Sequence, residues 1–186
     1  YQLLLNGLAD SELPASSPDD LQVVVLDAGR DGVAQITDVL RGYRNLSAVH
    51  VMSHGSSGSL QLGNARLDGA NLERYAQQLQ TWGGSLSAEG DILLYGCNVA
   101  GGEWGINFID NMVQLTGADV AASNDLTGSP SLGGNWNLEV QVGTIESTSI
   151  LDFAVANKYG YVLDSTIDLT QDTGSDPATF TITSAT

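Results

Sequence analysis

The sequence predicts an α/β fold, a three-layer sandwich in which helices flank a mainly parallel sheet. Short runs that are wholly apolar suit strands buried on both faces. Segments with helical periodicity alternate with these runs along the chain, which favours parallel strands joined by helices. The chain has 186 residues, of which 42% are hydrophobic, enough for one domain with its own core.

Each element follows from a local pattern. Four apolar runs predict buried strands at residues 22–26, 48–52, 91–95 and 118–122. Helical spacing predicts helices at residues 31–43, at 69–80 with Asp68 as the N-cap, and from 102 to 116 with Gly117 as the stop. Residues 60–62 and 65–67 flank Gly63-Asn64 and predict a small hairpin.

The ends of the chain have weaker patterns. Residues 1–8 predict a short helix, and residues 153–163 are similar to a strand. The alternation in residues 134–142 predicts a half-exposed antiparallel or edge strand. We therefore assign residues 1–163 to the α/β domain. Residues 164–186 are rich in Thr, Ser and Asp, which is typical of a linker or the start of another module.

The composition excludes several classes of function. Six basic and 22 acidic residues give a net charge of −16, which argues against binding to nucleic acid or to an anionic membrane surface. A single cysteine, Cys97, excludes an intrachain disulfide, and one cysteine with two histidines is too few for a structural zinc site. No apolar run reaches the roughly 18 residues that a membrane span needs. We expect neither a metal nor a cofactor.

His54 and Cys97 are the residues best placed for chemistry. Each comes immediately after a predicted apolar strand and is next to a glycine, in Ser53-His54-Gly55 and Gly96-Cys97. Functional residues of parallel sheets lie beyond the carboxyl ends of the strands, so neighbouring strands would bring both side chains to one edge. The other histidine, His50, lies four residues before His54; on a strand this spacing is about 13 Å, too far to share a metal ion. We interpret His50 as structural.

An imidazole beside a thiol suits nucleophilic catalysis. The imidazole accepts the thiol proton, the thiolate attacks a carbonyl, and the imidazolium protonates the leaving amine. The oxyanion that forms needs backbone donors, and the N–H groups of Gly55 and Cys97 are the candidates. A lone cysteine or histidine is more often structural; it is their matched placement after two strands that favours the dyad.

Four segments together carry a resemblance to a known family: VVVLDAGRDGVAQI, HVMSHGSSGSLQLG, DILLYGCNVAGG and TGADVAASNDLTG. Over about residues 1–145, the chain resembles the caspase-like cysteine peptidases. Within that group it is most similar to a bacterial caspase-like domain of unknown function near the N-termini of giant surface or adhesin-like proteins. The resemblance implies a catalytic dyad of His54 and Cys97. It also implies a pocket for the residue before the scissile bond, built from Tyr95 and from the loop that holds Asn124 and Asp125.

The same resemblance implies one more strand, upstream of Tyr1. Its absence would leave a gap near the centre of the sheet, which another chain could fill. Because the sequence does not begin with Met, we expect it to be a piece of a longer protein. Asp125 either selects a basic side chain by charge pairing or forms a turn before Gly128.

The leading hypothesis is a cysteine endopeptidase that acts on its own parent chain or on neighbouring proteins, in a secreted or surface-attached bacterial protein. The alternative is a caspase-like interaction module of an adhesin without catalytic activity. A third hypothesis, a nucleotide-binding domain, fits poorly with the net charge of −16.

Overall fold

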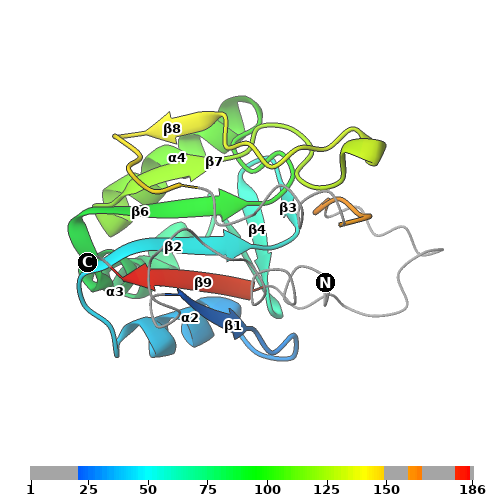
Figure 1. Ribbon diagram of the computed structural model, residues 1–186. Helices are drawn as coiled ribbons and strands as arrows, with labels where there is room; N and C mark the ends of the chain where they lie inside the picture. The colour runs from blue at the N-terminus through cyan, green and yellow to red at the C-terminus, as the bar shows by residue number, and fades with distance from the viewer. Residues whose placement is uncertain (1–20, 149–158, 165–178, 185–186) are drawn as a thin grey trace.

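A computed structural model describes residues 21–148, 159–164 and 179–184 (Figure 1). It has an α/β fold in which helices flank a mixed, mostly parallel central sheet, as the sequence predicts. The six strands lie in the order β1-β9-β2-β6-β7-β8. The sheet strands are β1 (Leu21–Val25), β2 (Leu46–Met52), β6 (Leu86–Tyr95), β7 (Asp119–Ala122), β8 (Val140–Val142) and β9 (Thr179–Ser184).

Three of the four predicted buried strands are parallel neighbours, whereas β1 is separated from β2 by β9. β2 pairs in parallel with β6, and β6 pairs in parallel with β7. At the edge, β8 pairs antiparallel with β7, which confirms an antiparallel edge strand within the predicted segment 134–142. A separate small sheet holds β3 (Gly55–Ser56), β4 (Ser59–Leu62) and β5 (Ala65–Asp68), and the β4–β5 pair is the predicted hairpin.

Within the described residues, three α-helices join the strands: α2 (Gly32–Leu40), α3 (Ala76–Ser85) and α4 (Gly102–Thr116), with short 3₁₀ helices η2 (Leu72–Tyr75) and η3 (Pro130–Leu132). Asp31 caps α2 by accepting a hydrogen bond from the Ala34 N–H at 3.0 Å. Gly117 ends α4 in the left-handed conformation (φ 73°), as predicted.

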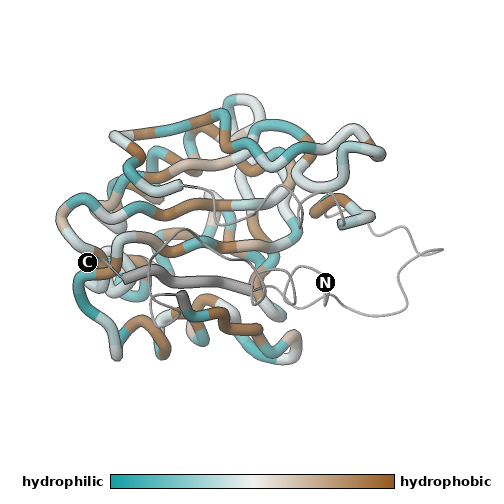
Figure 2. Tube along the Cα trace, viewed as in Figure 1, coloured by the Kyte–Doolittle hydropathy of each residue, from teal (hydrophilic) through white to brown (hydrophobic). Residues whose placement is uncertain are grey.

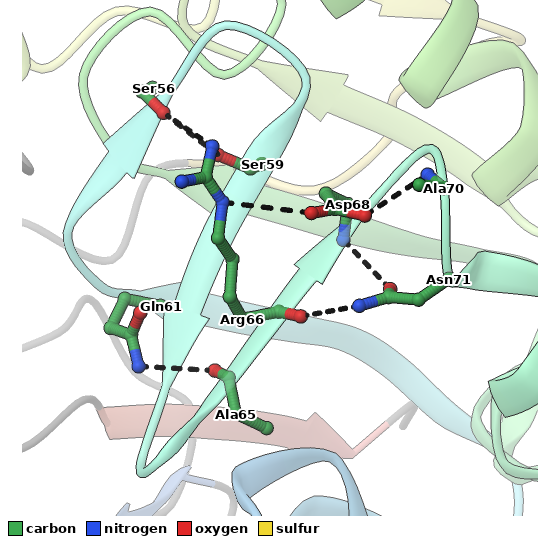
Figure 3. Close-up of polar contacts among 8 residues, drawn as sticks. All are labelled: Ser56, Ser59, Gln61, Ala65, Arg66, Asp68, Ala70 and Asn71. Atoms are coloured by element: carbon green, nitrogen blue, oxygen red, sulfur yellow. Dashed lines mark hydrogen bonds and ion pairs between the residues drawn. The ribbon is translucent and has the colours of Figure 1, made fainter.

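The predicted N-cap at Asp68 is wrong. Its carboxylate accepts from the Ala70 N–H, while Asn71 donates to the Arg66 carbonyl and accepts from the Asp68 N–H, so these residues form a turn (Figure 3). The helix begins later, through η2, and α3 runs to Ser85. A short polar side chain can accept a hydrogen bond from a backbone N–H in a turn as readily as at a helix N-terminus, which is why the sequence pattern was ambiguous.

The two faces of the sheet bury different clusters. Alternate residues of β2 and β6, such as Val51 and Leu94, pack with α2, α3 and α4 in the larger cluster. The opposite face holds the second cluster, which includes Met52, Tyr95 and Cys97. Figure 2 shows the hydrophobic residues concentrated along the central strands and the hydrophilic ones at the turns. No helix in the described part of the chain is long and apolar enough to cross a bilayer.

Residues 179–184 correct the predicted domain boundary. The sequence assigned them to a linker or a following module, but they form β9, which lies antiparallel between β1 and β2. β9 is thereby second in the strand order, between β1 and β2 (Figure 1, red). The predicted helix at residues 1–8 and most of the predicted strand at 153–163 lie outside the described residues. Val162 and Asp164 form isolated bridges only.

Candidate functional site

The structure places His54 and Cys97 at the same edge of the sheet. Met52 of β2 is paired in register with Tyr95 of β6, and the two candidate residues follow these strands two positions later. The Ser53 N–H continues the pairing by donating to the Tyr95 carbonyl at 3.0 Å. The side-by-side placement expected from two parallel strands is therefore present.

The N–H groups of Gly55 and Cys97 converge on one oxygen atom. Both donate to the carbonyl of Leu163, at 3.0 Å and 3.1 Å respectively. A side chain at Gly55 would prevent this arrangement, because a Cβ there would lie 2.6 Å from Val99 and 3.0 Å from the Cys97 carbonyl. The two donors predicted for an oxyanion thus hold a peptide carbonyl of the same chain.

The segment that ends at that carbonyl is hydrogen-bonded to the loop after β7. The Leu163 N–H donates to the Thr127 carbonyl at 2.8 Å, and the Ser129 N–H donates to the Tyr161 carbonyl at 2.8 Å. Val162 bridges antiparallel to Gly128. In Figure 1 this short orange piece lies beside the ends of the sheet strands. The loop after β7 therefore binds residues 161–163 as one strand binds another.

The Leu163 side chain lies in an apolar environment. It is 1% exposed and belongs to the second cluster, together with Tyr95 and Cys97. Tyr161, two residues earlier, is 59% exposed. The geometry thus distinguishes one buried, apolar position from one that faces solvent.

His54 is oriented by a backbone carbonyl. Its Nδ1 lies 2.7 Å from the carbonyl oxygen of Asp164. Because a carbonyl only accepts hydrogen bonds, Nδ1 carries the proton in this contact, and Nε2 of the neutral ring is the basic nitrogen. His54 is half-buried.

Cys97 is fully buried and its thiol is not ionised at neutral pH. Burial raises the pKa of the thiol to about 11, although the hydrogen bond from Thr127 acts in the opposite direction. The Thr127 N–H donates to Sγ at 3.2 Å, and Sγ donates to the Thr127 carbonyl at 3.5 Å. Asp164 and Asp125 raise the pKa further through their charge. A reaction at this sulfur therefore needs a nearby base.

The three predicted substrate-binding residues have different surroundings. Tyr95 is buried in the same cluster as Leu163. Asn124 is exposed, and its N–H donates to the Glu139 carboxylate. The Asp125 carboxylate accepts two hydrogen bonds from the Asn135 side chain, at 2.8 Å and 3.1 Å. Asp125 thus fixes its own loop, and the apolar cluster around Leu163 does not favour the selection of a basic side chain.

Thr127, Ser129 and Leu163 were not predicted as site residues. Thr127 and Ser129 contribute backbone groups, which any residue type supplies, so no sequence pattern marks them. Leu163 belongs to an apolar run that is equally typical of a strand. Only the tertiary fold brings these residues to the strand ends.

A shallow pocket lies beside His54, lined by Gly55, Leu60, Gln61 and Arg66 among others. Figure 3 shows Arg66 projecting from the β4–β5 hairpin towards Ser56, Ser59 and Asp68. Its guanidinium donates to Ser59 Oγ at 3.0 Å and lies 3.7 Å from the Asp68 carboxylate. The Arg66 side chain remains 59% exposed, so this wall of the pocket is positively charged and accessible to solvent.

Asp91, Asp119 and Glu146 are the described residues whose carboxylates are grouped closely enough to hold a metal ion. Asp119 is the first residue of β7, and Asp91, which pairs with it, lies within β6, six residues before Cys97. Asp91 accepts from the N–H groups of Glu146 and Ser147, and Asp119 accepts from that of Thr144. These bonds attach the chain after β8 to the sheet.

His50 has the structural role that the sequence predicts. It is 1% exposed and stacks on Tyr95, with ring centroids 6.1 Å apart. Burial lowers its pKa to about 3. The folded protein therefore holds this ring neutral at the pH where an exposed histidine would become charged.

This burial predicts an acid-dependent loss of stability. An unfolded His50 titrates near pH 6.5, so its contribution to stability is complete above that pH and falls by about 1.4 kcal/mol per pH unit down to about pH 3. Between pH 6.5 and 5, the wild type should lose about 2 kcal/mol more than His50→Phe. Urea unfolding of both proteins at the two pH values measures the difference, and equal losses would contradict it.

Residues 2–163 match the family described as a domain of unknown function, DUF4347. The search of curated proteins found no match, and neither did the search of solved structures. The family match covers most of the chain and ends at Leu163, the residue whose carbonyl lies between the Gly55 and Cys97 N–H groups. The chain belongs to the DUF4347 family.

Proposed function

We propose that this domain is a cysteine endopeptidase in which Cys97 is the nucleophile and His54 the general acid and base. The observation that carries the proposal is the carbonyl of Leu163, which accepts from both predicted oxyanion donors at the sheet edge where His54 and Cys97 lie. The resemblance of the four sequence segments to caspase-like peptidases supports the same function. By that resemblance, we place the domain in a secreted or surface-attached bacterial protein.

The reaction follows from these groups. His54 takes the proton of the Cys97 thiol, and the sulfur attacks the carbonyl carbon of the bound peptide. The oxyanion is stabilised by the N–H groups of Gly55 and Cys97. The C–N bond then breaks, and the imidazolium of His54 protonates the departing nitrogen. Water, deprotonated by His54, hydrolyses the thioester and releases a new carboxylate while the thiol is restored.

The raised pKa of the Cys97 thiol explains why the proposed reaction needs His54 as a base. With a pKa of about 11, Cys97 carries very little thiolate at pH 7, so proton transfer must accompany attack. The same observation favours a second candidate function. A protonated thiol next to a bound peptide segment also suits a module of an adhesin that binds peptides without catalysing a reaction.

Hydrolysis of a peptide distinguishes the two candidates. A quenched fluorogenic peptide with the sequence of residues 159–168 should be cleaved by the wild-type chain and not by Cys97→Ala. Thermal melting of both proteins checks that the variant keeps its fold. Equal rates for the two proteins would contradict a peptidase and leave the binding module, and so would a wild-type chain that cuts neither the peptide nor itself.

A further inference from the structure

We propose that the bond cut by this domain is its own Leu163–Asp164 peptide bond. This inference rests on the proposed function and names its substrate. The Leu163 carbonyl already accepts from the Gly55 and Cys97 N–H groups, the two donors assigned to the oxyanion. A carbonyl in that position is the one whose carbon the Cys97 sulfur would attack.

Backbone contacts hold the segment on both sides of the bond. Before it, the Leu163 N–H and the Tyr161 carbonyl are bonded to Thr127 and Ser129. After it, the Asp164 carbonyl accepts from Nδ1 of His54 at 2.7 Å, and Asp164 bridges to Gly55. Holding both sides fixes the orientation of the reacting group, which is a large part of what an enzyme contributes to the rate.

The side chains define the specificity of this reaction. Leu163 is buried in the apolar cluster with Tyr95, so a charged residue at its position would lose solvation without a partner. Tyr161 is 59% exposed, and its side chain should contribute little. The site therefore selects a large apolar residue immediately before the cut.

The products follow from the chemistry of the dyad. The Leu163 carbonyl carbon forms a thioester with Cys97, and the Leu163–Asp164 bond breaks. The nitrogen of Asp164 takes a proton from His54 and becomes a new amino terminus. One water molecule then hydrolyses the thioester and leaves a carboxylate on Leu163. No other co-reactant is needed.

The fold predicts what happens to the released piece. The fragment Asp164–Thr186 contains β9, which is paired on both sides, with β1 and with β2. Cutting the bond before Asp164 breaks none of these pairings. The two products should therefore remain together in native buffer and separate only in denaturant.

Two measurements on the full chain test this inference. Intact mass spectrometry in denaturant identifies the fragments, and size-exclusion chromatography in native buffer shows whether they remain together. The wild type should yield a fragment ending at Leu163 and a fragment beginning at Asp164, which elute together in native buffer. Leu163→Asp should slow the cut at least about 100-fold. Leu163→Met, which keeps a large apolar side chain, and Tyr161→Ser, at the exposed position, should both be cut far faster than Leu163→Asp.

Because Leu163 is buried, Leu163→Asp could also destabilise the domain. Asp164→Pro is therefore a second variant, which retains Leu163 but replaces the leaving amide with a proline nitrogen. It should also stop the cut, while its melting temperature shows whether it is folded.

Two results would overturn the inference and leave the proposed function in place. One is a Cys97-dependent cut at another bond. The other is an uncut chain that still hydrolyses the 159–168 peptide through Cys97, because residues 161–164 would then be an inhibitor. A chain that cuts neither itself nor the peptide would remove both proposals.

Discussion

His54→Ala is expected to slow peptide cleavage by about 10²–10⁴-fold, the usual contribution of a general acid–base residue. The reason is the thiol of Cys97, whose pKa burial raises to about 11. Without an imidazole, only the small fraction of molecules that already carry a thiolate can react. Cys97→Ala, which removes the sulfur itself, should show no cleavage at all.

The pH dependence separates this mechanism from a structural effect of the substitution. In His54→Ala the rate should rise about tenfold per pH unit up to about pH 11, because the thiolate fraction rises in that proportion. The wild-type rate should depend on pH far less steeply. Initial rates on the 159–168 peptide between pH 6 and 10 measure both profiles. A His54→Ala profile parallel to that of the wild type would contradict general base catalysis by His54.

Ending the chain at Ala178 is expected to destabilise the domain by on the order of 5 kcal/mol or more. This truncation removes β9, which pairs with five residues of β1 and six of β2. Each ladder hydrogen bond contributes about 0.5–1.5 kcal/mol, and the loss also leaves two strand edges unpaired in the middle of the sheet. The expected loss is comparable to the total stability of a typical domain, about 5–15 kcal/mol.

Urea unfolding compares this truncation with a control chain that ends at Ser184 and keeps β9. The control should unfold at the same midpoint as the full chain. A synthetic peptide of residues 179–184, added in excess, should restore part of the stability of the truncated chain, because it can occupy the position between β1 and β2. Equal midpoints for the truncated and control chains would show that β9 contributes nothing to the sheet.

Sequence patterns predicted the parallel pairing of β2 and β6 and the placement of His54 and Cys97 after the same ends of these strands. β2 and β6 are buried apolar runs, and the rule that sites lie beyond the carboxyl ends of parallel strands brings His54 and Cys97 together. The Gly63-Asn64 turn and the Gly117 stop were also predictable, because each depends on a local conformation that few residues adopt.

The features that the sequence did not predict depend on contacts between residues that are far apart in the chain. β9, with the sequence TFTITS, is short, and four of its six residues are Thr or Ser. Its place between β1 and β2 depends on pairings with residues more than 100 positions away. The position of Leu163 likewise depends on the backbone of the loop after β7 and on N–H groups at two strand ends. Backbone groups carry no sequence signal. Local patterns could therefore indicate that His54 and Cys97 lie together, but not that residues 161–164 lie beside them.

The most direct test of the central claim is to trap the thioester between Cys97 and the Leu163 carbonyl. Hydroxylamine added to the wild-type chain during cleavage attacks thioesters and converts the acyl group to a hydroxamate. Peptide mapping by mass spectrometry should then find a hydroxamate on Leu163 in the wild type and none in Cys97→Ala. A hydroxamate on another residue, or one that forms without Cys97, would contradict attack of this sulfur on the Leu163 carbonyl.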